Sequence, residues 1–134
     1  MRIIQVLKSQ VRCYDGDFNL SQIIPMLDEE TGAEPRVISA NIVDPYLLLI
    51  RDDASVYLAS IDKNNELEEV EKEDAFLVST KWLSGCLYQD RDGIFSRETG
   101  KGNKNGEDIL MFLLSAAGAL YVSSVLARSL CDIY

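Results

Sequence analysis

Short apolar segments separated by turn residues recur along the chain, and none shows the sustained period of an amphipathic helix. This pattern predicts an all-β fold. In the first half we expect strands at 3–7, 11–14, 18–26, 37–43, 46–50 and 55–61. In the second half we expect strands at 67–71, 76–80 and 82–88, followed by a polar, glycine-rich loop over 89–108.

One segment has two interpretations: residues 109–127, ILMFLLSAAGALYVSSVLA, contain no charged side chain. Their length is close to the ~20 apolar residues with which a helix crosses a bilayer. The same residues can also form two strands joined by a turn. The first interpretation gives a small membrane-anchored protein with a span at 109–127, and the second gives a β-hairpin.

Comparison of the chain with itself favours the hairpin. Shifted by 64 positions, the segment YLLLIRDDASVYLASI falls on LMFLLSAAGALYVSSV, so that Tyr57 meets Tyr121. Gly118 stands where a tight turn favours glycine. Because the first copy carries the charged triplet RDD at its centre, we do not expect either copy to span a bilayer.

A weaker match indicates the length of the repeat. Val11 precedes Val56 by 45 positions, and removing about 19 surplus loop residues from the 64 again leaves ~45, in the range of a four-stranded propeller blade. A blade packs against neighbours on both faces, so its inner strands can be apolar throughout. The sequence therefore predicts antiparallel four-stranded blades of a WD40-like β-propeller, in an incomplete ring.

The expected division of the chain follows from this repeat. We expect a partial propeller blade at 1–36, a blade with the start of the next at 37–88, a polar loop insertion at 89–108 and the inner hairpin of the next blade at 109–134.

Charge narrows the possible partners. The 134 residues suffice for one modest domain and carry a formal net charge of −9, which argues against a general nucleic-acid binder. Much of the charge lies in two acidic runs, 28–30 (DEE) and 66–74 (ELEEVEKED). We favour a solvated face for both runs, and an acidic docking surface for a basic partner is the alternative.

Catalytic and metal-binding chemistry has little support in the sequence. The chain has no histidine, so it offers neither a Ser/His nor a Cys/His nucleophile system. Cys13, Cys86 and Cys131 lie far apart without a metal-binding spacing and suggest a reducing compartment. We assign no catalytic, cofactor-binding or metal-binding residue, and we expect neither a cofactor nor an enzyme.

A few aromatic and basic residues are candidates for contact with a partner. For Trp82, Tyr57 and Tyr121 we favour packing between blades. The basic residues of the polar loop could contact RNA phosphates, but acidic neighbours nearly cancel their charge. The basic residues are Arg91, Arg97, Lys101 and Lys104, and the acidic ones are Asp90, Asp92, Glu98, Glu107 and Asp108.

Four strings in chain order resemble a known family. They are RIIQVL at the start, YDGD at 14–17, IVDPYLLLIRDDAS at 42–55 and KWLSGCLY at 81–88. With them, the chain closely resembles the large subunit of the cleavage and polyadenylation specificity factor, particularly in its fungal forms. The resemblance covers nearly the whole chain and is weakest in the loop 89–108. Such a protein is about ten times longer, so we expect a fragment.

The resemblance implies both a fold and a role. Members of this family, which include the large subunit of the damaged-DNA-binding complex and a component of splicing factor 3b, are scaffolds built from β-propellers. It implies a non-enzymatic scaffold segment of a nuclear pre-mRNA 3′-end cleavage and polyadenylation complex. The implied partners are the other subunits of that complex, with pre-mRNA reached only through the complex and no membrane contact. A propeller segment of a related scaffold, of the damaged-DNA-binding or splicing factor 3b type, is the first alternative, and the membrane-anchored protein is the second.

Overall fold

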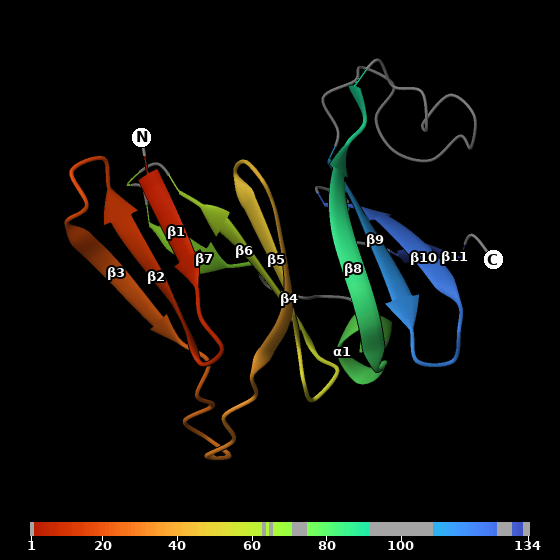
Figure 1. Ribbon diagram of the computed structural model, residues 1–134. Coiled ribbons are helices and arrows are strands. Elements are labelled where there is room, and N and C mark those ends of the chain that lie inside the picture. Colours follow the sequence, from red (N-terminus) through yellow and green to blue (C-terminus); the bar gives the residue numbers. More distant parts are fainter. Residues whose placement is uncertain are drawn as a thin grey trace.

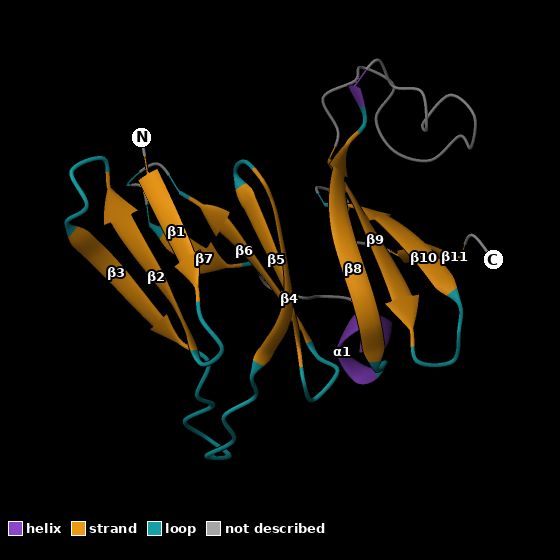
Figure 2. Cartoon of the chain, viewed as in Figure 1, coloured by secondary structure: helices purple, strands orange, loops and turns teal. Residues whose placement is uncertain are grey.

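The computed structural model describes residues 2–62, 64, 66–70, 75–91, 109–125 and 130–132. In this part of the chain, eleven strands form three antiparallel sheets that lie side by side, with one short helix near the third sheet (Figures 1 and 2). The all-β prediction is confirmed.

The first sheet has three strands in sequence order, and one of its faces is packed. In the middle strand, Val11 and Cys13 are buried while their neighbours are less so, the period of two expected for such a strand. Phe18, which we expected in the third strand, lies instead in the preceding turn with a φ of 64°. The strands are β1 Arg2–Val6, β2 Gln10–Asp15 and β3 Leu20–Pro25.

The second sheet has four strands in sequence order, and its central strands are buried on both faces. Leu47 and Leu49 pack toward the first sheet, whereas Leu48 and Ile50 pack toward the third. A sheet between two neighbours has no solvent-facing side at its centre, which explains the unbroken apolar run. The strands are β4 Val37–Val43, β5 Tyr46–Arg51, β6 Val56–Ile61 and β7 Leu67–Glu69.

The third sheet contains the uncharged segment as a hairpin. Its strands are β8 Trp82–Gln89, β9 Ile109–Ser115, β10 Leu120–Ser124 and β11 Leu130–Asp132, in sequence order across the sheet. The alternative of a membrane-spanning helix at 109–127 is wrong, because residues 109–125 contain two paired strands. Among the helices of the described residues, none has the length and apolar character needed to cross a membrane.

One expected strand is a helix. The sequence predicts a strand at 76–80, but the structure has the helix α1, Ala75–Ser79. The β-favouring residues of this segment are overridden by tertiary contacts. In a strand, adjacent side chains would point to opposite faces, whereas here Phe76 and Leu77 both pack around Trp82.

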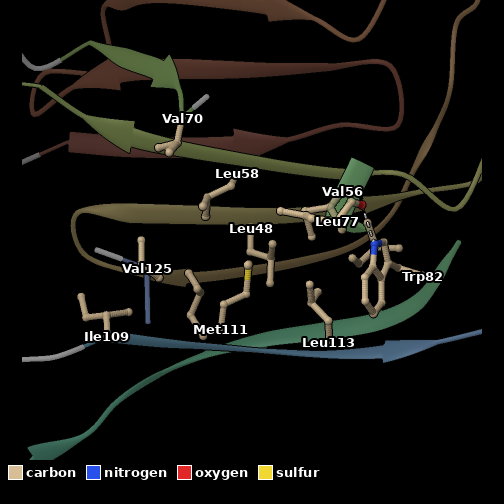
Figure 3. Packing of buried hydrophobic residues seen from close by; sticks show 12 residues of the cluster. Leu48, Val56, Leu58, Val70, Leu77, Trp82, Ile109, Met111, Leu113 and Val125 are labelled. Carbon is tan, nitrogen blue, oxygen red and sulfur yellow. Dashed lines mark hydrogen bonds between the residues drawn. The ribbon is translucent and has the colours of Figure 1, made fainter. Parts of the chain in front are cut away.

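Two hydrophobic clusters fill the two seams between the sheets. The first seam, between the first and second sheets, contains Val11, Cys13, Met26, Leu47, Leu49, Tyr57, Ala59 and Leu67. The second seam, between the second and third sheets, is shown in Figure 3 and contains Leu48, Ile50, Val56, Leu58, Val70, Leu77, Trp82, Leu87, Ile109, Met111, Leu113 and Val125. Each seam draws side chains from two sheets, so the sheets stabilise one another.

The structure also confirms the internal repeat. β5 and β6 pair Leu49 with Tyr57, and β9 and β10 pair Leu113 with Tyr121, 64 positions later. The first strands of the second and third sheets begin 45 positions apart, the repeat length expected. The described sheets form no closed ring, as expected for part of a propeller. The division into four domain ranges stays a prediction, and residues 92–108 of the expected loop lie outside the described residues.

Candidate interaction surface

Trp82, at the start of β8, lies in the second seam with 1% of its surface exposed. Its Nε1 donates a 2.9 Å hydrogen bond to the carbonyl oxygen of Leu77 (Figure 3). Its ring meets those of Phe76 and Tyr121 edge-on, with centroid distances of 6.1 and 5.5 Å. Buried tryptophan rings favour this geometry with a partner for the N–H, so Trp82 is a packing residue.

Tyr57 and Tyr121 occupy equivalent positions and both pack toward the preceding sheet. Tyr121 is half-buried in the second seam, with its ring 5.1 Å from that of Phe76. Tyr57 lies in the first seam and is 6% exposed. The guanidinium carbon of Arg51 stands 5.7 Å from the centre of the Tyr57 ring, within the range of a cation–π contact.

The hydroxyl of Tyr57 makes no hydrogen bond to any other residue that the structure describes. It is not among the buried unpaired polar atoms of the described residues, so its oxygen is accessible to solvent although the residue is 6% exposed. Burial, together with the charge of Glu69, raises the pKa of Tyr57 to about 12, and the charge of Arg51 opposes the rise. The phenolic oxygen therefore lies within the electrostatic reach of both Glu69 and Arg51.

A hollow of about 480 Å³ lies beside Tyr57, between the loop from β3 to β4 and the turn from β5 to β6. We call it the acidic hollow. The buried residues Met26, Pro35 and Tyr57 form its floor. The exposed carboxylates of its rim are Asp28, Glu29, Glu30, Asp53 and Glu69, and Arg51 is the basic residue beside them.

The acidic hollow brings together the two acidic runs that are separate in the sequence. The run 28–30 supplies three rim residues, and Glu69 of the run 66–74 supplies another. Asp53 joins them from the β5–β6 turn, where burial raises its pKa but hydrogen bonds from Ser55 and the charge of Arg51 hold that pKa below its usual value. The sequence shows the runs but gives no signal that they meet.

Two polar side chains tie neighbouring sheets together, and sequence reasoning missed both. Gln22 on β3 donates from Nε2 to the carbonyl oxygen of Leu67, and its Oε1 accepts the N–H of the same residue, both at 2.8 Å. Asn41 on β4 accepts the N–H of Leu87 on β8 at 2.7 Å. Neither residue belongs to a motif, so only the structure identifies these contacts.

The remaining candidates are not brought into one site. Asp90 is fully buried and Arg91 is exposed, while the other charged loop candidates at 92–108 lie outside the described residues. Cys13 is buried and Cys86 is exposed, both as free thiols, and the side chain of Cys131 is not described. Within the described residues, no three histidine, cysteine, aspartate or glutamate side chains are grouped to hold a metal ion.

The three antiparallel sheets, packed face to face and repeating along the chain, define part of a β-propeller. A family model described as the RSE1/DDB1/CPSF1 second β-propeller matches residues 1–128, and the chain belongs to this family. The match confirms the resemblance seen in the sequence to the large subunit of the cleavage and polyadenylation specificity factor.

Fungal relatives are similar over most of the chain. Protein cft1 of Neurospora crassa is 68% identical over 123 residues, which are 90% of this chain and 8% of that protein. Protein CFT1 of Coccidioides immitis is 42% identical over 134 residues, covering 98% of this chain and 10% of the relative. Protein cft1 of Aspergillus oryzae is 38% identical over 122 residues, which are 90% of this chain and 9% of that protein. The chain thus spans 8 to 10% of the length of these relatives.

Proposed function

We propose that the chain is a scaffold segment of a nuclear pre-mRNA 3′-end cleavage and polyadenylation complex, and that it provides surfaces for other subunits instead of catalysis. The match of residues 1–128 to the propeller family carries this proposal. The family also covers the RSE1 and DDB1 scaffolds, but the similar curated proteins are named cft1, homologues of the large component of the cleavage and polyadenylation specificity factor.

The packing of the chain supports a scaffold role. The singled-out residues Trp82 and Tyr57 are buried in seams, and Tyr121 packs against the second. This leaves turns, loops and outer strands as the surfaces that a partner meets, and such surfaces on a rigid framework commonly carry binding function. The net charge of −9 opposes direct contact with phosphates, so pre-mRNA is reached through other subunits.

A domain exchange in the full-length protein tests this role. Residues 1–128 are replaced by the equivalent second-propeller segment of an RSE1-type scaffold, and the subunits that purify with the tagged protein are quantified by mass spectrometry. We expect one or more polyadenylation subunits to be lost while the exchanged protein stays folded by thermal unfolding. Full recovery of every subunit would show that this segment gives the complex no specific contact.

A second measurement tests the route to RNA. In a fluorescence anisotropy titration of the 134-residue chain with a labelled single-stranded RNA, we expect no binding of useful affinity at physiological salt. A salt-sensitive submicromolar signal would instead assign direct RNA contact to the chain.

A further inference from the structure

We propose that the acidic hollow binds the basic side chain, arginine or lysine, of a protein partner. The inference rests on the proposed scaffold function and deepens it by naming the chemistry of one partner contact. The observations that carry it are the rim carboxylates and the accessible, unpaired hydroxyl of the otherwise buried Tyr57.

Two of the five rim carboxylates are not used by the fold itself. The carboxylates of Glu29 and Glu30 make no hydrogen bond or ion pair to another described residue. The carboxylate of Asp28 accepts the N–H groups of Glu30 and Thr31 and shapes the loop, and that of Asp53 accepts from Ser55. The side chain of Arg51 donates to Ser55 and forms no ion pair within 4.0 Å with a described residue. Its charge acts on Asp53, but one positive charge stands against the five carboxylates of the rim.

Tyr57 supplies an observation that is independent of the acidic rim. The residue is only 6% exposed and lines the hollow, yet its hydroxyl oxygen is not among the buried unpaired polar atoms of the described residues, so this oxygen is accessible to solvent. The hydroxyl makes no hydrogen bond to a described residue, so its acceptor capacity is not used by the fold. An entering ammonium or guanidinium group would donate to this oxygen in place of solvent.

The shape of the acidic hollow fits a basic side chain better than a bare metal ion. Lysine and arginine carry an aliphatic stem and a charged head, which match an apolar floor and an acidic rim. A volume of about 480 Å³ lies in the usual range for ligand sites, about 300–1,000 Å³. Within the described part of the chain the carboxylates form no metal-binding group, and the separated donors of a guanidinium can reach carboxylates that are spread apart.

The test uses the 134-residue chain and the peptide acetyl-Gly-Arg-Gly-amide, with citrulline replacing arginine in the matched control peptide. Binding is followed by shifts of backbone amide signals in ¹H–¹⁵N NMR spectra at low salt. We expect the arginine peptide to shift the signals of Tyr57 and Glu69. The citrulline peptide, which keeps the shape but lacks the charge, should bind at least about 10-fold more weakly.

Two variants locate the binding on the protein, and a third serves as their control. Glu69→Gln removes a rim charge and should weaken binding of the arginine peptide about 3- to 10-fold. Tyr57→Phe keeps the ring and removes the hydroxyl, and should weaken binding about 2- to 10-fold. The control, Glu68→Gln, makes the same charge change at the neighbouring exposed position outside the hollow, and should change the affinity less than about 2-fold.

Equal binding of the citrulline peptide, no detectable binding of the arginine peptide, or equal effects of Glu68→Gln and Glu69→Gln would each overturn the inference. The last result would mean attraction to the net negative charge instead of binding in a site. These measurements need no other subunit, so their outcome is independent of the domain exchange. Peptide binding can be absent while the exchange still supports the scaffold role, and peptide binding can be present while the exchange shows no loss of subunits.

Discussion

The hairpins β5–β6 and β9–β10 have the same backbone but different surroundings. In each turn, the N–H of the last residue of the first strand donates to the carbonyl oxygen four residues later, at 3.0 Å in the first hairpin and 2.9 Å in the second. Ala54 and Gly118, at the same place in the two turns, both have a positive φ, of 66° and 90°. The repeat therefore extends to the turns, where both copies place a residue with a positive φ at the same position.

The two turns differ in how they hold the segment that precedes their sheet. The N–H of Asp52 donates to the carbonyl oxygen of Arg36 at 2.7 Å, and its carboxylate accepts the N–H of Arg36 at 2.9 Å. In the second hairpin, the N–H of Ala116 donates to the carbonyl oxygen of Lys81 at 2.9 Å, and the methyl side chain can add no second bond. The charged turn thus holds the loop before β4 with two hydrogen bonds, whereas the uncharged turn holds the residue before β8 with one.

These differences decide what lies beside each tyrosine. Before β8 the chain forms α1, which places the ring of Phe76 against Tyr121 and fills that side of the second seam. Before β4 the chain forms the loop 26–36 (Figure 1). This loop leaves the acidic hollow beside Tyr57. The hairpins are alike, so the segment that connects one sheet to the next determines the surroundings of each tyrosine. Tyr121 is covered by Phe76 of α1, whereas Tyr57 lines a hollow that a ligand can enter.

The largest expected effect is loss of the aromatic contacts in the second seam. Trp82→Ala should destabilise the chain by about 3–5 kcal/mol, because it leaves a cavity and removes ring contacts with Phe76 and Tyr121. Leu83→Ala, at the adjacent position that is 55% exposed, should change stability by less than about 0.5 kcal/mol. Chemical denaturation measures both, and a Trp82→Ala effect as small as that of the control would contradict the packing role.

A matched pair of substitutions compares the two seams directly. Leu49 and Leu113 are equivalent, and both are 0% exposed. Leu49→Ala and Leu113→Ala should each cost about 2–5 kcal/mol of unfolding free energy, with values that agree within about 1 kcal/mol. Denaturant titrations of the two variants check this. If Leu49→Ala costs much less, the hollow beside the first seam allows that seam to collapse around the cavity.

The sequence predicts the strands well because their signals are local. Both-face burial leaves an unbroken apolar run in β5 and β9, and turn residues separate each pair of strands. The helix α1 cannot be predicted in this way, since five residues are too few for a helical period to be visible. Its conformation depends on Trp82, which lies three residues beyond its end.

The acidic hollow could not be predicted either, for a different reason. Its rim joins the loop 26–36, the β5–β6 turn and β7, which become neighbours only when the first two sheets pack. The sequence does show the two acidic runs, and an acidic docking surface is one of their two interpretations. The position of Tyr57 below them depends on the register between β5 and β6.

Alkaline pH should lower the free energy of unfolding through Tyr57, the buried tyrosine of the first hairpin. The unfolded chain releases the Tyr57 proton near pH 10, whereas in the folded chain the raised pKa is about 12. This contribution to stability is therefore complete below pH 10 and is lost as the pH rises through 12, about 2 kcal/mol in all. Urea denaturation from pH 9 to 12 should show a steeper loss for the native sequence than for Tyr57→Phe, and parallel curves would contradict the shift.

The smallest expected effect comes from exchanging the turn residues that the two hairpins do not share. Gly118→Ala places a Cβ where φ is 90°, and should cost about 1 kcal/mol although no atom of the described residues lies within 4 Å of the new carbon. Ala54→Gly relieves the same strain at a φ of 66° but gives the unfolded chain more freedom, and should stabilise by only about 0.5 kcal/mol. Thermal unfolding of both variants gives the sign of each change in stability. Opposite signs would confirm that the two turns share one backbone geometry. If both substitutions destabilise the chain, the charged turn, which Asp52 ties to Arg36, needs the alanine at position 54.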